Sequence, residues 1–231
     1  MTARPLPRPL AHLRRVLRRL ARDTRGVALV EFAFAAPIVL GIGTYAIELA
    51  NYGITQMRVS QIALNLADNA SRVGATSNLS IQQLREVDIN DVLQAARYQG
   101  SKIGLTTTGR ITLSSLEQNS SGGQWIHWQR CIGLKSGSGY ASSYGVAGDG
   151  ATGTGFAGMG ETGAKVTAPP ASGVMFVEIN FDYQPVFGNW VLGTKKIKYI
   201  ASFIVRDNRD FSQVYNPTPA ATESSCSTYS A

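Results

Sequence analysis

The stretch RGVALVEFAFAAPIVLGIGTYAIELAN, Arg25 to Asn51, decides how the rest of the sequence is interpreted. Its apolar part, Val27 to Leu49, holds 23 residues. At about 1.5 Å per residue these form a helix of roughly 35 Å, which spans the hydrocarbon core of a bilayer. A carboxylate, Glu31, nevertheless stands five residues into the apolar part. Left unpaired at bilayer depth, such a group costs about 2.5–3.5 kcal/mol on insertion scales.

The net charge of +7 is concentrated before this stretch. Residues 1–25 contain eight of the 22 basic side chains and one of the 15 acidic ones. The remaining 206 residues are balanced and offer no basic surface of the kind that binds nucleic acid. By the positive-inside rule, residues 1–25 are cytoplasmic and the residues after Asn51 lie outside.

Two other interpretations of the N-terminal segment are weaker. A secretory signal peptide has a shorter apolar core that ends at a small-residue cleavage site. Here the helical period continues through residues 52–73, with one apolar face made of Val59, Ile62, Ala63, Leu66, Ala70 and Val73. An Arg-rich, acid-poor start is also typical of mitochondrial transit peptides, which leave the following helix unexplained. We therefore expect one helix from near Val27 to near Val73, half in lipid and half packed on a domain.

Gly26 stands where the basic segment meets the apolar helix, and Glu31 and Phe32 complete the pattern G-x-x-x-x-E-F. Pro37 follows inside the span, where it is expected to kink or loosen the helix. With these features the sequence resembles the type IV pilin superfamily, most closely the TadE-like pseudopilins of the tight-adherence (Flp-type) pilus system. The resemblance is specific over residues 25–37, moderate over the helix and the run VEINFDYQPVF, and absent over residues 135–170.

The resemblance implies that a prepilin peptidase removes the basic leader, residues 1–26, by cutting between Gly26 and Val27, and that Val27 can then be methylated. A glycine suits a cleavage site because its backbone opens easily from the helix. The cut leaves an ammonium on Val27, which Glu31 can neutralise in its own chain or from a neighbour. Glu31, Phe32 and Pro37 are then helix and assembly residues. In an uncut chain Glu31 would instead reach the headgroups or pair with Arg25.

The resemblance also implies a location and partners. The span 27–50 would hold the chain in a bacterial inner membrane, with the domain 51–231 in the periplasm and possible entry into the pilus after processing. The implied partners are the prepilin peptidase, the major Flp-type pilin, other pseudopilins and the inner-membrane assembly platform.

Residues 51–231 are expected to form an α+β domain. A second helix is expected to end near Gly100. Within it, Asp88 and Asn90 are able to cap a new start, which would divide the helix in two. Alternation of apolar residues predicts strands at 110–118, 124–134, 173–187 and 195–207, the first two joined by the turn NSSGG. In the third strand Met175, Val177, Ile179 and Phe181 share a face. The predicted fold class is pilin-like α+β, a long N-terminal transmembrane helix packed on a roughly four-stranded, mostly antiparallel sheet.

The segment 135–170 is rich in glycine, with eleven glycines over residues 133–163. It contains three overlapping G-x-G-x-x-G matches, none of which follows an apolar strand or opens a helix as dinucleotide binding requires. We expect a flexible, solvent-exposed loop.

Cys131 and Cys226 lie 95 residues apart, and one disulfide in an oxidising compartment is the simplest interpretation. Two buried free thiols are the alternative. A disulfide would attach the polar tail, residues 214–231, to the second strand.

The sequence contains no acid, base or metal pattern that indicates catalysis, and no cofactor is expected. Of the two histidines, His12 lies in the leader and His127 lies between Trp125 and Trp128 in a strand. His127 and Cys131 would share a face about 13 Å apart, too far for a base and its nucleophile. We expect a structural histidine, packed tryptophans and a non-enzymatic protein. The alternatives are an uncleaved membrane-anchored scaffold, such as a TadG-like protein, and a membrane-tethered periplasmic enzyme or binding domain.

Overall fold

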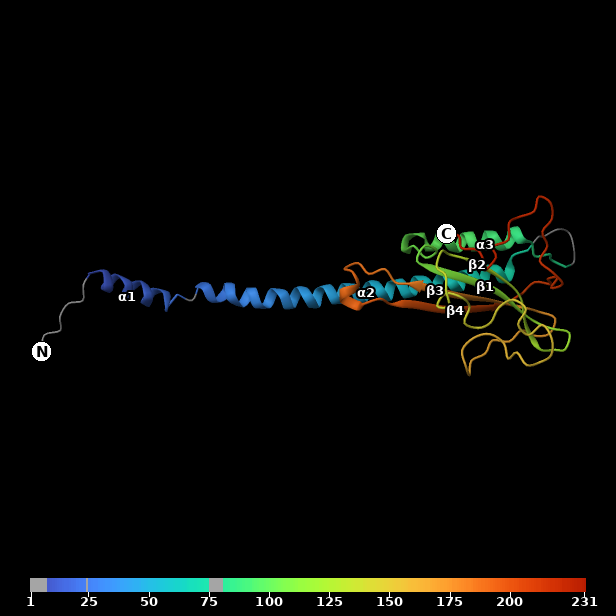
Figure 1. Cartoon of the computed structure of the whole chain (residues 1–231), viewed down its shortest axis with the longest axis horizontal. Helices are drawn as coiled ribbons and strands as arrows, with labels where there is room; N and C mark the ends of the chain where they lie inside the picture. The colour runs from blue at the N-terminus through green and yellow to red at the C-terminus, as the bar shows by residue number, and fades with distance from the viewer. Residues whose placement is uncertain (1–7, 24, 75–80) are drawn as a thin grey trace. The chain divides into compact units, whose positions relative to one another are not determined.

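The computed structural model describes residues 8–23, 25–74 and 81–231 (Figure 1). Its helices and strands are α1 (Arg8–Leu20), α2 (Arg25–Arg72), α3 (Glu86–Gly100), the 3-10 turn η1 (Ser101–Ile103), β1 (Gly109–Gln118), β2 (Gln124–Ile132), β3 (Val174–Asp182), α4 (Asn189–Leu192) and β4 (Lys196–Ile204). The chain divides into two compact units, Met1–Ile47 and Glu48–Ala231. The division falls inside α2. The extent of α2 agrees with the single long helix predicted from the sequence.

The first unit holds α1 and the apolar part of α2. From Val27 to Ile47 the large apolar side chains of α2 are exposed all round the helix, namely Val27, Leu29, Val30, Phe32, Phe34, Ile38, Val39, Leu40, Ile42, Tyr45 and Ile47. A helix that is apolar on every side belongs in an apolar environment. This part of α2 is long and apolar enough to cross a membrane, a property that a signal sequence near an N-terminus shares. Pro37 lies within α2, and the helix continues through it.

The second unit is built on a four-stranded sheet in the order β2-β1-β3-β4. Every neighbouring pair is antiparallel, and β1 and β2 form the predicted hairpin around residues 119–123. The register of β1 and β2 shifts once, because Ser115 faces Trp128 whereas Leu116 faces Ile126. His127 is therefore the extra residue of a β-bulge. The molecule is α+β, with a long apolar helix and an antiparallel sheet.

One face of the sheet carries the main core. The second half of α2 and all of α3 pack on it (Figure 1), and the predicted face of β3 is confirmed because Met175, Val177, Ile179 and Phe181 all join this core. The helices contribute Val59, Ile62, Ala63, Leu66, Ala67, Ala70, Ile89, Val92, Leu93 and Ala96.

Most residues of the glycine-rich segment are exposed, as expected, but residues around Met159 and Ala168 cover part of the opposite face of the sheet. Met159 is fully buried and Ala168 nearly so, and they pack with Leu116, Ile126, Val174 and Phe176. Glycine permits this close packing. At Gly150 the backbone φ is +78°, and a Cβ would lie 2.2 Å from the carbonyl oxygen of Gln124.

The second helix is one piece, Glu86–Gly100, and the predicted division at Asp88 and Asn90 does not occur. Asp88 lies in the first turn, where its Oδ2 accepts the backbone N–H of Arg85 at 3.0 Å. A carboxylate in that position stabilises the start of a helix. The side chain of Asn90 bonds to the C-terminal tail instead of capping a helix.

Candidate functional site

The residues predicted as a processing and assembly site all lie at the start of α2. Gly26 and Val27 are in its first turn, followed by Glu31, Phe32 and Pro37. A Cβ at Gly26 would touch nothing within 4 Å, so packing within this chain does not require a glycine there. Phe32 is exposed, as is the side chain of Glu31, and among the described side chains Glu31 has no ion pair.

A second carboxylate of the same helix, Glu48, is held inside the folded domain. It is the first residue of the second unit and fully buried. The phenol of Tyr183 donates a hydrogen bond to Glu48 Oε1. The backbone N–H groups of Val186 and Phe187 donate to its two carboxylate oxygens at 3.2 and 2.9 Å. Three donors from one loop therefore compensate a carboxylate that burial would otherwise make costly.

Tyr183 is held from the other side as well. Asn51 Nδ2 donates to its hydroxyl at 2.6 Å, and the ring of Tyr52 meets the Tyr183 ring edge-on with centroids 5.0 Å apart. Burial and the hydrogen bond to Glu48 raise the pKa of Tyr183 to about 12. We call Glu48, Asn51, Tyr183, Val186 and Phe187 the Glu48 clamp. Sequence analysis missed it and placed Glu48 within the apolar stretch, although a carboxylate at the end of an apolar run was a visible signal.

His127 joins a small polar cluster on the helix-facing side of the sheet. Ser115 Oγ donates to Glu117 Oε1 at 2.6 Å, and His127 Nδ1 lies 2.9 Å from Glu117 Oε2. The imidazole also stacks on Trp125 with ring centroids 4.1 Å apart. The serine proton points to the carboxylate rather than to the imidazole, so the arrangement lacks the serine–histidine contact that activates a nucleophile.

His127 and Cys131 do not share a face, contrary to the sequence-based expectation. The bulge at His127 turns its side chain toward Glu117, whereas Cys131 stands opposite Thr112, whose side chain points to the other face. Regular alternation along β2 was assumed, and one extra residue reverses it. The predicted packing of Trp128 is confirmed, since this ring is buried in the main core.

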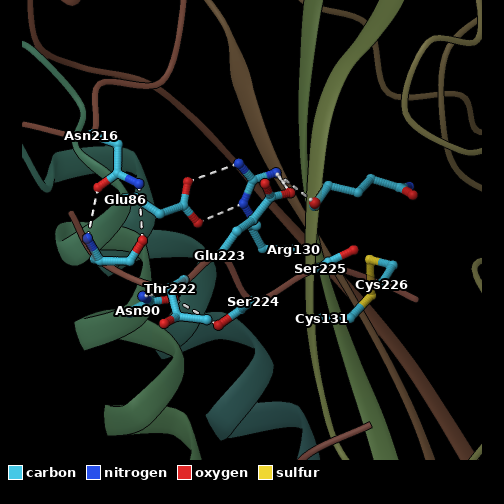
Figure 2. A network of polar contacts seen from close by, with 12 residues as sticks. Glu86, Asn90, Arg130, Cys131, Asn216, Thr222, Glu223, Ser224, Ser225 and Cys226 are labelled. Carbon is cyan, nitrogen blue, oxygen red and sulfur yellow. Dashed lines mark hydrogen bonds and ion pairs between the residues drawn. A yellow bond between two sulfur atoms is a disulfide. The ribbon is translucent and has the colours of Figure 1, made fainter. Parts of the chain in front are cut away.

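The C-terminal tail is attached by a polar network (Figure 2). Arg130 donates from Nε and Nη2 to the two carboxylate oxygens of Glu86, at 2.7 and 2.8 Å, and this two-bond ion pair is buried. The more exposed Glu223 of the tail approaches Arg130 Nη1 at 3.1 Å. The arginine of β2 therefore joins α3 and the tail.

Further contacts hold the tail along the outer edge of β2. Ser224 Oγ donates to Asn90 Oδ1 at 2.6 Å, and the carbonyl oxygen of Ser224 accepts the backbone N–H of Cys131 at 2.8 Å. The predicted disulfide between Cys131 and Cys226 is present (Figure 2). Arg110 of β1 also holds the tail at this bond, because its Nη2 donates to the carbonyl oxygen of Cys226 at 2.7 Å.

Among the described residues, no group of three or more His, Cys, Asp or Glu side chains is placed to hold a metal ion. The turn between β3 and β4 borders a hollow of about 320 Å³, which is lined by Asp182, Tyr183, Gln184, Pro185, Asn189, Thr194, Lys195 and Lys196.

Comparison of the chain with protein-family models, with curated proteins and with solved structures gave no match. Functional conclusions therefore rest on the sequence pattern and the geometry described above.

Proposed function

We propose that this chain is a pilin-like membrane subunit, a TadE-like pseudopilin that takes part in assembly of a tight-adherence pilus. The observation that carries the proposal is the change of surroundings along one helix. From Val27 to Ile47 helix α2 exposes apolar side chains on all sides, and from Val59 to Ala70 it buries one face against the sheet. A subunit that is first held in a bilayer and later packs among other helices needs a helix that is apolar on all sides, since both surroundings are apolar.

The charge at the start of α2 supports the same function. Val27 and Glu31 are four residues apart in a helix and therefore lie on the same side, about 6 Å apart along the axis. Cleavage after Gly26 would create an ammonium on Val27 within reach of the Glu31 carboxylate. That pairing, in one chain or between neighbours, would remove most of the cost of a carboxylate at bilayer depth.

The proposed location is a bacterial inner membrane with the second unit in the periplasm. The disulfide between Cys131 and Cys226 suits an oxidising compartment. The proposed partners are the prepilin peptidase, the major pilin, other pseudopilins and the assembly platform. The task is structural, and the chain itself is the substrate of the peptidase.

Co-expression with a prepilin peptidase tests the proposal through three chains: native, Gly26→Val and Gly43→Val. A Cβ at Gly26 or at Gly43 meets nothing within 4 Å, so the two substitutions are matched in their effect on packing. We expect the native and Gly43→Val chains to lose residues 1–26 and start at Val27, as intact-mass measurement would show. The Gly26→Val chain should keep its full length.

A native chain that stays uncut in the presence of an active peptidase would overturn the pseudopilin proposal and favour an uncleaved scaffold. A second measurement concerns assembly. Glu31→Gln should still be cleaved but should co-purify less with the major pilin, because the neutral amide cannot pair with an ammonium. Unchanged co-purification would remove Glu31 from the assembly mechanism.

A further inference from the structure

The turn that contains α4, residues 185–193, exposes three large apolar side chains. Trp190 is 76% exposed, more than any other large apolar side chain in the described part of the chain, and Val186 and Phe187 are 63% and 37% exposed. Three such side chains within five residues form an apolar projection on a domain whose other apolar residues mostly lie in the core. We call residues 185–193 the Trp190 turn.

The projection is held in place by the fold. The backbone N–H groups of Val186 and Phe187 bind the carboxylate of Glu48, and Leu192 packs against the main core. At Gly188 and Gly193 the backbone φ is +86° and +69°, values that glycine adopts readily, and these residues bracket the single turn of α4. Exposure of Trp190 is therefore a property of an ordered segment.

The position of the turn along α2 indicates what Trp190 meets. Glu48 directly follows Ile47, the last residue of the fully exposed apolar run. A loop bound to Glu48 therefore lies next to the residue at which the apolar run ends, and if residues 27–47 span a bilayer this is where the helix leaves the hydrocarbon core. Tryptophan is enriched at that level, because its ring is apolar and its N–H finds partners among the headgroups.

Charge beside the turn suits the same surface. Lys195 and Lys196 follow α4, and both side chains are exposed. Lys196 Nζ donates to the carbonyl oxygen of Gly139 at 2.9 Å and lies over the ring of Tyr140. Basic side chains near an anionic leaflet contribute about 1 kcal/mol each.

We propose that the Trp190 turn is a membrane-interface contact, in which Trp190, Val186 and Phe187 enter the headgroup region of the leaflet from which α2 emerges. The exposed Lys195 beside the turn would then be available to the lipid phosphates. The contact orients the domain at the bilayer before assembly. This inference rests on the proposed membrane anchoring by residues 27–47.

The test uses the full chain in vesicles of phosphatidylethanolamine and phosphatidylglycerol, with bromine on the acyl chains either near the headgroups or near the bilayer centre. Bromine quenches nearby tryptophan fluorescence. Native protein should lose most of the emission of Trp190 with shallow bromine and less with deep bromine. The Trp190→Phe chain should show little quenching, since Trp128 is buried in the main core and Trp125 stacks on His127 within the domain.

Two added tryptophans in the Trp190→Phe chain separate the possible failures. Phe34→Trp reports insertion of the span and should be quenched by deep bromine. Val87→Trp reports a distant exposed site. Gln82, just before α3, pairs with Arg209, which donates to the carbonyl oxygens of Ala70 and Val73 at the C-terminal end of α2, about 36 Å of helical rise from Glu48. The tryptophan of Val87→Trp should not be quenched.

Quenching at Phe34→Trp without quenching of Trp190 would overturn the membrane-interface contact alone and point to a protein partner for the turn. No quenching at Phe34→Trp would overturn membrane anchoring and the contact together. Equal quenching at Val87→Trp and Trp190 would overturn the membrane-interface contact as well, because the domain would then meet the bilayer without preference for this turn.

Discussion

The buried carboxylate of Glu48 in α2 accepts a hydrogen bond from the phenol of Tyr183, which stands 135 residues later in the chain, after the end of β3. This contact ties the first turn of the folded domain to the loop that follows the sheet's third strand. The same helix carries a second carboxylate, Glu31, which is exposed and has no ion pair among the described side chains. The two glutamates therefore lie in different surroundings, and substitution can distinguish them.

Glu48→Gln should destabilise the folded domain by about 1–3 kcal/mol. The carboxylate offers two acceptor oxygens to the three buried donors, whereas the amide offers only one. Denaturant unfolding of the detergent-solubilised chain measures this cost, and faster hydrogen exchange at the amides of Val186 and Phe187 would locate it. Glu31→Gln is the matched control and should leave domain unfolding unchanged. Equal stability of the two variants would contradict a structural role for the Glu48 clamp.

The raised pKa of Tyr183 predicts a loss of stability in alkali. The phenol has a pKa near 10.0 when unfolded and about 12 when folded. Folding thus favours the protonated form, whose stabilisation is complete below pH 10 and is lost as the pH rises through 12. We expect native protein to lose more stability than Tyr183→Phe between pH 10 and pH 12, measured by unfolding at several pH values. Parallel curves would show that this phenol does not contribute.

The buried ion pair should respond unequally to single and double substitution. Arg130→Met leaves the carboxylate of Glu86 buried without its partner, which costs about 3–5 kcal/mol. Replacing both residues, by Arg130→Met with Glu86→Leu, should recover most of the stability that Arg130→Met loses. Glu223→Ala removes the more exposed partner and should cost less than about 1 kcal/mol. A double variant as unstable as Arg130→Met would mean that lost packing, rather than the stranded charge, sets the cost.

Loss of the disulfide should release the tail. The bond closes a loop of 95 residues, and the loop-entropy model gives about 4–5 kcal/mol for that length. The Cys131→Ser, Cys226→Ser double variant should unfold at lower denaturant than the native chain and be cut sooner by protease within residues 214–231. Reducing agent should reproduce the effect in native protein and have none on the variant.

The glycine-rich segment should be intolerant of side chains only where it approaches the sheet. Gly150→Ala places a Cβ against the carbonyl oxygen of Gln124 at positive φ and should cost about 1–3 kcal/mol. Gly155→Ala, where a Cβ meets nothing within 4 Å, should be nearly neutral. Thermal unfolding of the two variants gives the comparison. Equal tolerance at both positions would indicate that the segment leaves the sheet in solution.

Much of the architecture was predictable because it depends on local periodicity. The apolar run and the helical period that follows it determine α2, and alternation marks β3, where the four residues predicted to share a face all join the main core. The hairpin followed from a turn sequence between two strand patterns. Each of these signals lies within a short window of the chain.

The candidate site could be predicted only in part for the same reason. Gly26, Val27 and Glu31 form a linear pattern beside a change in charge, which a sequence displays directly. The Glu48 clamp joins residues 135 or more positions apart, and no local pattern pairs a glutamate with two backbone amides of a remote loop. The burial of Met159 likewise depends on a sheet face that composition does not reveal.

By itself, the sequence determined the helix that can span a bilayer, the basic segment before it, the positions of the four strands and the two cysteines, because hydrophobic period, charge and spacing are properties of neighbouring residues. Tertiary structure alone decided that Glu48 is buried rather than left in lipid, that Trp190 projects beside it, and that the glycine-rich segment covers the sheet. These outcomes depend on which distant donors and surfaces meet when the chain folds.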